Sequence, residues 1–138
     1  MHGRLEVRTT GPGLHEITGA VAEWLAGRGA DDAVLTLFLR HTSASLLIQE
    51  NADPDVRADL ATFFRRFAPH ADMPGMGWIT HRSEGPDDMP AHIRAAVLPV
   101  MLTVPVSSGR MLLGTWQGIF LFEHRDRPHR REVVLTLH

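Results

Sequence analysis

The sequence contains no cysteine and no long apolar run. Without cysteine, disulfide bonds and thiolate metal sites are excluded, so any metal ion has to be bound by His, Asp or Glu side chains. No apolar stretch reaches the roughly 18 residues that a membrane-spanning helix needs, and no apolar run follows the first residues as it would in a signal peptide. We therefore expect a cytoplasmic protein that does not contact a membrane.

Net charge is low and internal repeats are absent. The formal net charge of −2 argues against binding to bulk nucleic acid, although local basic clusters are present. No repeat, linker or low-complexity segment interrupts the 138 residues, of which 43% are hydrophobic and 22% are charged. This composition is typical of globular proteins. The length predicts one domain over residues 1–138 with a sizeable core.

Apolar patterns indicate an α+β domain with a mainly antiparallel sheet. Alternating or continuous apolar runs predict seven or eight strands, which include residues 5–9, 33–39, 46–48, 100–106, 111–113, 119–123 and 132–137. Helical spacing predicts three helices: one from Ile17 that Gly27 and Gly29 end, one that begins at Asp53-Pro54 and runs to Phe67, and one near Pro90 that Pro99 limits.

Three strand patterns carry more specific expectations. The run from Ala33 to Leu39 is almost continuously apolar, which predicts a central strand buried on both faces. The residues 107–110 (Ser-Ser-Gly-Arg) predict a hairpin turn. Gly114 and Gly118 flank a Trp-Gln pair within a strand pattern, so we expect a bulge or the close approach of another segment there.

The stretch His81–His92 has the most unusual composition, with two imidazoles, three carboxylates and two prolines in twelve residues. Pro86 and Pro90 restrict the backbone torsion φ, which predicts a rigid loop leading into a helix. Asp87 or Asp88 is expected to cap that helix. A rigid loop can present side chains to a ligand or ion, but a capped helix start in a surface loop would explain the same residues without any function.

Histidine is abundant, with nine residues in the chain. Five of them lie beside polar or turn residues: His41, His81, His92, His124 and His129. Three neutral imidazoles are a common open site for zinc or a similar ion, and the candidates are His41, His81 and His92. Side chains that could hydrogen-bond these ligands are Glu84, Asp88 and Thr42. Because no His-Glu-x-x-His pair is present, only the fold can assemble such a site, and for each histidine alone a surface or core position is the commoner role.

Phosphate binding is a second possibility. Thr42, Ser43 and Ser45 offer hydroxyl groups, and guanidinium forks suited to phosphate oxygens come from Arg82, Arg125, Arg127, Arg130 and Arg131. Mg²⁺ could be held next to a diphosphate by Asp53, Asp87 and Asp88. No Walker or dinucleotide glycine pattern is present, so nucleotide binding by those routes is not expected. Arginines of this kind more often form a solvated surface.

Four polar motifs follow one another along the chain. They are His-Thr-Ser-Ala-Ser at 41–45, Glu-Asn-Ala-Asp-Pro-Asp-Val at 50–56, His81 with Glu-Gly-Pro-Asp-Asp-Met-Pro-Ala-His at 84–92, and Leu-Gly-Thr-Trp-Gln-Gly-Ile at 113–119. Together they resemble the YjbQ-like family, also called the secondary thiamine-phosphate synthase family. The motifs occur in that family's order, and the resemblance covers essentially the full chain.

The resemblance implies a sandwich-like α+β fold that assembles as a homotrimer, with a histidine site suited to a divalent metal such as zinc or magnesium. It also implies a weak thiamine-phosphate synthase activity on small phosphorylated substrates. That reaction joins an aminopyrimidine diphosphate to a thiazole phosphate and releases pyrophosphate.

The motif residues suit that reaction in three roles. Candidate metal ligands are His41, His81 and His92, and candidate catalytic residues are His41, Glu84 and Asp88. Candidates for substrate binding are Thr42, Ser43, Asn51, Asp53, Arg82, Trp116, Gln117 and Arg130. In this hypothesis the arginines bind phosphates, whose departure needs positive charge, and the indole of Trp116 stacks on a substrate ring.

Two other interpretations of the motifs stay open. The protein could be a metal-dependent hydrolase of a small phosphorylated or amide metabolite, which would turn over one substrate without an organic partner. It could also be a non-catalytic trimer that binds an anion or metabolite, which would bind tightly and form no product.

Overall fold

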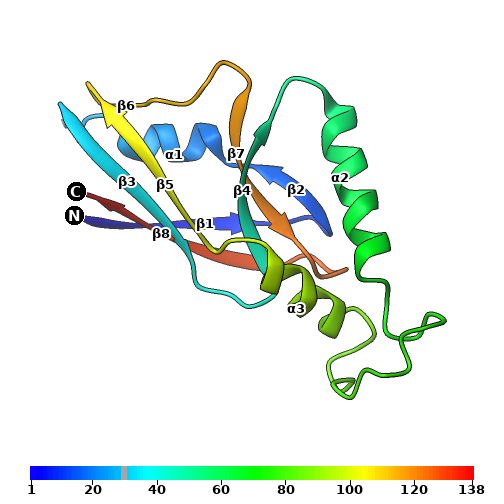
Figure 1. Ribbon diagram of the computed structural model, residues 1–138. Helices are drawn as coiled ribbons and strands as arrows, with labels where there is room; N and C mark the ends of the chain where they lie inside the picture. Colours follow the sequence, from blue (N-terminus) through cyan, green and yellow to red (C-terminus); the bar gives the residue numbers. More distant parts are fainter. Residues whose placement is uncertain (29–30) are drawn as a thin grey trace.

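The computed structural model describes residues 1–28 and 31–138, within which lie eight strands and three helices (Figure 1). The strands are β1 (His2–Arg8), β2 (Gly13–Glu16), β3 (Asp32–Leu39), β4 (Ala44–Glu50), β5 (Met101–Ser107), β6 (Arg110–Met111), β7 (Gln117–Glu123) and β8 (Arg130–Leu137). The helices are α1 (Thr18–Leu25), α2 (Pro54–Phe67) and α3 (Asp88–Val97). Gly29, expected to help end the first helix, lies outside the described residues.

The strands form two antiparallel sheets. One has the order β1-β8-β3-β5-β6, and the other has the order β2-β7-β4. β1 pairs with β8 from His2↔Thr136 onward, so the two chain ends lie side by side (Figure 1). The expected α+β fold with mainly antiparallel strands is therefore confirmed. No helix among the described residues is long and apolar enough to cross a membrane.

The core lies between the two sheets, where alternate side chains of each strand meet. Leu35, Leu37 and Leu39 of β3 are at most 1% exposed and belong to the same apolar cluster as Leu46 and Leu121 of the smaller sheet. Val21 and Leu25 of α1 complete the cluster at one end. Burial with a period of two is what a sheet covered on one face produces.

The prediction that the strand from Ala33 to Leu39 is buried on both faces is wrong. β3 is central in its sheet, since it pairs with both β5 and β8. However, Phe38 on its outer face is 45% exposed. A continuous apolar run normally marks a strand between two covering layers, and among the described residues only the inner face has such a layer.

Helix α2 begins as the sequence predicts but is poorly covered. Asp53 is the N-cap, its carboxylate accepts a hydrogen bond from the Asp55 backbone N–H at 2.9 Å, and proline occupies the first turn. None of its residues is buried, and the stacked rings of Phe63 and Phe67 are 57% and 48% exposed. The Phe64 ring packs on the sheet, where it meets the ring of Phe122 in β7.

Helix α3 begins near the predicted place but without the predicted carboxylate cap. Asp87 is the N-cap residue, yet its side chain makes no capping hydrogen bond. Its carboxylate instead accepts hydrogen bonds from Arg125 and from the Asp126 backbone N–H. The capping prediction failed because residues distant in sequence offered this carboxylate stronger donors.

Two turn predictions are confirmed. Ser108 and Gly109 have φ of 50° and 72°, as in the two-residue turn that joins β5 to β6. A Cβ atom on Gly118 would lie 2.6 Å from the Glu16 carboxylate, so glycine permits the close approach that the motif indicated. β2, which brings Glu16 there, was not predicted, and β6 is shorter than the predicted strand.

Arg94, in the last turn of α3, joins this helix to the end of α2 and to the segment after β7. The residue is 7% exposed, and its guanidinium donates to the backbone carbonyls of Phe64, Ala68 and His124 at 2.7–3.1 Å. Two of these carbonyls belong to the end of α2 and the third follows β7. Arg94 therefore fixes α3 relative to the smaller sheet.

Replacing Arg94 by methionine is expected to lower the free energy of unfolding by about 2–4 kcal/mol, because buried carbonyls lose their donors. Urea denaturation measures this difference. Arg66→Met, at an exposed position of α2, is the matched control and should change stability by less than about 0.5 kcal/mol. Equal midpoints for the two variants would contradict the structural role of Arg94.

Candidate metal centre

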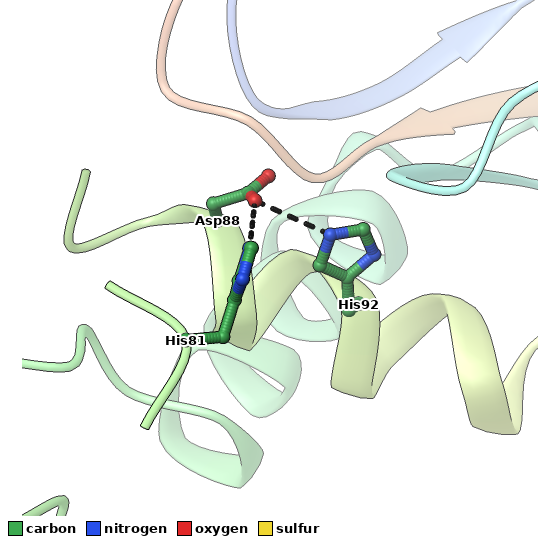
Figure 2. Close-up of side chains that lie close together, drawn as sticks. All are labelled: His81, Asp88 and His92. Atoms are coloured by element: carbon green, nitrogen blue, oxygen red, sulfur yellow. Dashed lines mark hydrogen bonds and ion pairs between the residues drawn. The ribbon is translucent and has the colours of Figure 1, made fainter. Parts of the chain in front are cut away.

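Three side chains converge at the start of α3. Each of His81, Asp88 and His92 offers one ligand atom, and these atoms lie within 4.8 Å of one another (Figure 2). Asp88 Oδ2 is 2.6 Å from His81 Nε2 and 3.2 Å from His92 Nε2. The carboxylate thus lies between the two imidazoles.

Local structure explains this convergence. Asp88 and His92 are four residues apart on α3, so their side chains lie on the same helix face. His81 comes from the preceding loop, which Arg82 holds in shape by donating to the carbonyls of Ala71, Met76 and Ile79. One guanidinium thus connects three backbone carbonyls of a loop that has no regular secondary structure.

The hydrogen bonding of His92 prepares it to bind a cation. Its Nδ1 lies 3.0 Å from the Thr42 carbonyl oxygen, which only accepts, so Nδ1 carries the hydrogen. In a neutral ring, Nε2 then points a lone pair at an oxygen of Asp88. Two lone pairs at this distance repel each other unless a proton or a metal ion lies between them. Ligating histidines usually have their other nitrogen bound to a carbonyl in this way.

Asp88 is a buried but ionised carboxylate. It is 5% exposed, and burial by itself raises its pKa. The hydrogen bond with His81 and the positive charge of Arg125 outweigh burial, so the pKa of Asp88 lies below its ordinary value. Arg125 Nη1 is 2.9 Å from Asp88 Oδ1, and Arg125 Nε is 2.8 Å from Asp87 Oδ2. One arginine therefore holds Asp88 and leaves Oδ2 for the imidazoles.

The three side chains fit a divalent metal ion. Two imidazole nitrogens and one carboxylate oxygen are a known open ligand set that leaves positions for substrate. Metal bonds of about 2.1 Å place neighbouring ligand atoms roughly 3 to 3.5 Å apart. The distance between Asp88 and His92 already has this value, and His81 would move outward by less than about 1 Å.

His41, a predicted ligand and catalytic residue, has a different position. Its Nε2 accepts the Glu132 backbone N–H at 2.8 Å, and its Nδ1 lies 3.4 Å from Arg131 Nη1. Burial and the charge of Arg131 lower the pKa of His41. Among the described residues, His41 is not part of the converging cluster, where Asp88 supplies the third ligand atom instead.

A cavity of about 560 Å³ lies beside the centre. His92 lines it, so the cavity and the metal cluster share one side chain. The other lining residues come from the end of β3 and from α3 with the segment after it: Phe38, Leu39, Arg40, His41, Thr42, Ala95, Ala96 and Val100.

A buried ion pair that the sequence did not indicate lies next to His41, which lines the cavity. Glu123 is fully buried, and its carboxylate accepts hydrogen bonds from Arg131, Thr9 and the Arg125 backbone N–H. Burial raises its pKa, but these hydrogen bonds outweigh burial, so the net pKa is below the ordinary value. The hydroxyl of Ser43, predicted to bind substrate, accepts from Arg131 at 2.9 Å. No local sequence pattern indicated this pair.

Two further histidines with polar neighbours are also tied into the fold. His124 is fully buried, and burial with the charge of Arg94 lowers its pKa to about 3. Its Nε2 lies 2.9 Å from the hydroxyl of Ser45. His129 Nδ1 donates to the Arg127 carbonyl at 2.7 Å. Neither belongs to the metal cluster of the described residues.

Three other residues that were predicted to bind substrate or to be catalytic do not line the cavity. All three donor atoms of Arg82 are used within its own loop. The Arg130 side chain is 74% exposed and lies 3.7 Å from Glu6. Glu84 is exposed, and its backbone carbonyl accepts from Arg125. Arg82 and Arg130 thus lie next to groups of the protein, whereas the phosphate hypothesis required both to face a phosphate.

The remaining predicted residues lie at the opposite end of β4. Ala44 pairs with Glu123 at one end of β4 and Glu50 pairs with Gln117 at the other, a separation of about 20 Å along the strand. There, Asn51 donates to Glu16 at 3.0 Å, Asp53 caps α2, and Trp116 is 64% exposed. A single chain therefore divides the predicted site residues between two distant clusters.

Comparison with known proteins shows similarity over the whole chain. A family model described as "UPF0047 protein YjbQ-like" matches residues 3–138. The UPF0047 protein sll1880 of Synechocystis is 48% identical over 131 residues, covering 95% of this chain and 86% of that protein. The UPF0047 protein YjbQ of Salmonella typhimurium is 44% identical over 126 residues, covering 91% and 88%.

Solved structures show the same fold. The conserved hypothetical protein TT1486 from Thermus thermophilus superposes with a TM-score of 0.84, at 36% identity and 99% coverage of both chains. The hypothetical protein APE1520 from Aeropyrum pernix superposes with a TM-score of 0.87, at 28% identity, covering 100% of this chain and 98% of that one. Both sheets and all three helices lie within the covered residues.

Elemental analysis of the purified protein tests the metal centre. We expect about one transition metal ion per chain in the native protein and in His70→Ala, because His70 pairs with Asp126 and is not one of the three converging side chains. His81→Ala, Asp88→Asn and His92→Ala should lose the ion. Arg125→Met should keep the ligands but weaken metal affinity by about 10- to 100-fold. Stoichiometric metal in all three ligand variants would contradict the assignment.

Proposed function

Because this chain belongs to the UPF0047 YjbQ-like family, we propose that it is a metal-dependent enzyme with weak thiamine-phosphate synthase activity. The reaction joins an aminopyrimidine diphosphate to a thiazole phosphate. A bond forms between the thiazole nitrogen and the methylene carbon of the pyrimidine, while the bond between that carbon and the diphosphate oxygen breaks. Pyrophosphate leaves with the electron pair of the broken bond.

The observation that carries this proposal is the Asp88 carboxylate between two imidazoles. An ion held by His81, Asp88 and His92 would neutralise charge that gathers on the departing pyrophosphate. Two imidazole ligands favour zinc or a similar transition metal over magnesium, which prefers oxygen ligands. Arg125 keeps Asp88 oriented, and together with the hydrogen bond from His81 it keeps this carboxylate ionised and able to bind a cation.

The proposed reaction requires neither Asp88 nor His41 to act as a base. Formation of the new carbon–nitrogen bond needs no proton removed from either substrate, so the site needs no free base. Asp88 acts in this proposal as a metal ligand, whereas the sequence indicated a catalytic residue or a hydrogen-bond partner of the histidine ligands. His41 holds its place as a neutral acceptor for a backbone N–H, and it supports the cavity wall.

We further propose that the chain forms a homotrimer. Support comes from α2, whose amphipathic sequence would normally be buried on its apolar side. Phe63 and Phe67 stack on one another and stay largely exposed, as expected of side chains that another subunit covers. A trimer could also bring the cluster around Asn51 and Gln117 of one subunit close to the metal centre of another.

The synthase proposal is tested by incubating the metal-loaded protein with both organic substrates and measuring thiamine phosphate and pyrophosphate. We expect equimolar products that depend on the bound metal, and a rate in Asp88→Asn lower by more than about 100-fold. His70→Ala should keep the native rate. Phosphate released from either substrate alone would favour the hydrolase, and tight binding without product would favour the non-catalytic interpretation.

Sedimentation equilibrium tests the assembly. Phe63→Asp should shift the protein from trimer to monomer, because a charge at a buried apolar contact is costly. Arg65→Asp, on the opposite side of α2, is the control and should stay trimeric. A monomeric native protein would contradict the trimer, and a trimeric Phe63→Asp variant would exclude this helix face as its interface.

A further inference from the structure

The cavity beside the metal centre has apolar walls. Phe38, Leu39 and Val100 come from the strand side, and Ala95 with Ala96 comes from α3. The two alanines have small side chains, so the helix projects little into the cavity on this side. A volume of about 560 Å³ lies within the range of small-molecule sites.

Phe38 gives this cavity an uncovered aromatic ring. The neighbouring inward residues of β3 are at most 1% exposed, whereas Phe38 on the outer face is 45% exposed and lines the cavity. Aromatic rings prefer offset or edge contacts with other rings, which add to the free energy of burial. The exposed ring is therefore placed to stack on a planar ligand.

The charged and ring-nitrogen groups of the cavity wall already have partners within the protein. Arg40 pairs with Glu132 at 2.8 Å. His41 accepts a backbone N–H, and its lowered pKa keeps its ring uncharged at neutral pH. The Thr42 carbonyl accepts from His92. The charge that a ligand meets is thus concentrated at the metal cluster, at the side of the cavity that His92 lines.

We propose that this cavity binds the planar aromatic ring of the substrate, stacked on Phe38 and packed against Ala96, with its phosphate-bearing arm directed to the metal cluster. This ring-binding cavity, the ring site, rests on the proposed function for the identity of the phosphate-bearing arm. It assigns ring recognition to Phe38 instead of Trp116, which lies at the far end of β4. The ligand class is a heteroaromatic ring carrying a phosphate or diphosphate.

The test compares three probes by isothermal titration calorimetry: thiamine, thiamine phosphate and inorganic pyrophosphate. Ala96→Trp, which fills the cavity, should weaken binding of thiamine phosphate and thiamine by at least about tenfold, and Phe38→Ala by about three- to tenfold. Pyrophosphate affinity and metal content should stay unchanged in both variants. Val97→Trp adds the same side chain at the next, 57% exposed position, which does not line the cavity, and should bind all probes normally.

The outcomes separate the ring site from the metal-dependent function. Unchanged thiamine phosphate affinity in Ala96→Trp, or an equal loss of pyrophosphate affinity, would overturn the ring site even if the protein holds metal and has synthase activity. Failure of the native protein to bind thiamine phosphate would overturn it as well. Absence of metal with ring binding that Ala96→Trp still abolishes would refute the proposed function and keep the ring site.

Discussion

The ion pair between Arg125 and Asp88 is the contact on which the candidate site depends. Burial alone would raise the pKa of Asp88, but the hydrogen bond with His81 and the positive charge of Arg125 together lower it below its ordinary value. Arg125 also binds Asp87, so one residue after β7 fixes the start of α3 and the direction of Asp88 Oδ2. His81 and His92 form a candidate metal site with Asp88 because both imidazoles approach that oxygen. A short helix thereby presents a candidate metal site through contacts with a loop that is far away in the sequence.

The polar motifs lie at the two opposite ends of β4, which indicates different roles for the two groups of residues. The motif with Thr42 lies beside the candidate metal centre, and the motif with Asn51 lies about 20 Å away along the strand. Hydrogen bonds within the second cluster, such as that between Asn51 and Glu16, already give it a role in holding β2, β4 and α2 together. Under the proposed function, this cluster would take part in catalysis only if another subunit of the proposed trimer brought it to the candidate centre.

Exposed aromatic residues point to two different uses of the surface. Phe63 and Phe67 stack along a helix face that nothing in the described chain covers, which suits a contact between subunits. Phe38 stands alone at the edge of a cavity next to His92, which suits a ligand. The distinction rests on the surroundings of each ring, since hydrophobicity is the same in both cases.

Short-range signals in the sequence determined the start of α2 at Asp53, the hairpin at Ser108-Gly109 and the close approach at Gly118. They also supported family membership, because those motifs are contiguous and each depends on neighbouring residues. Tertiary structure alone decided that Asp88 joins the imidazoles in place of His41, and that one face of β3 is open. Both outcomes depend on contacts between segments that are far apart in the sequence, whose register no local pattern encodes.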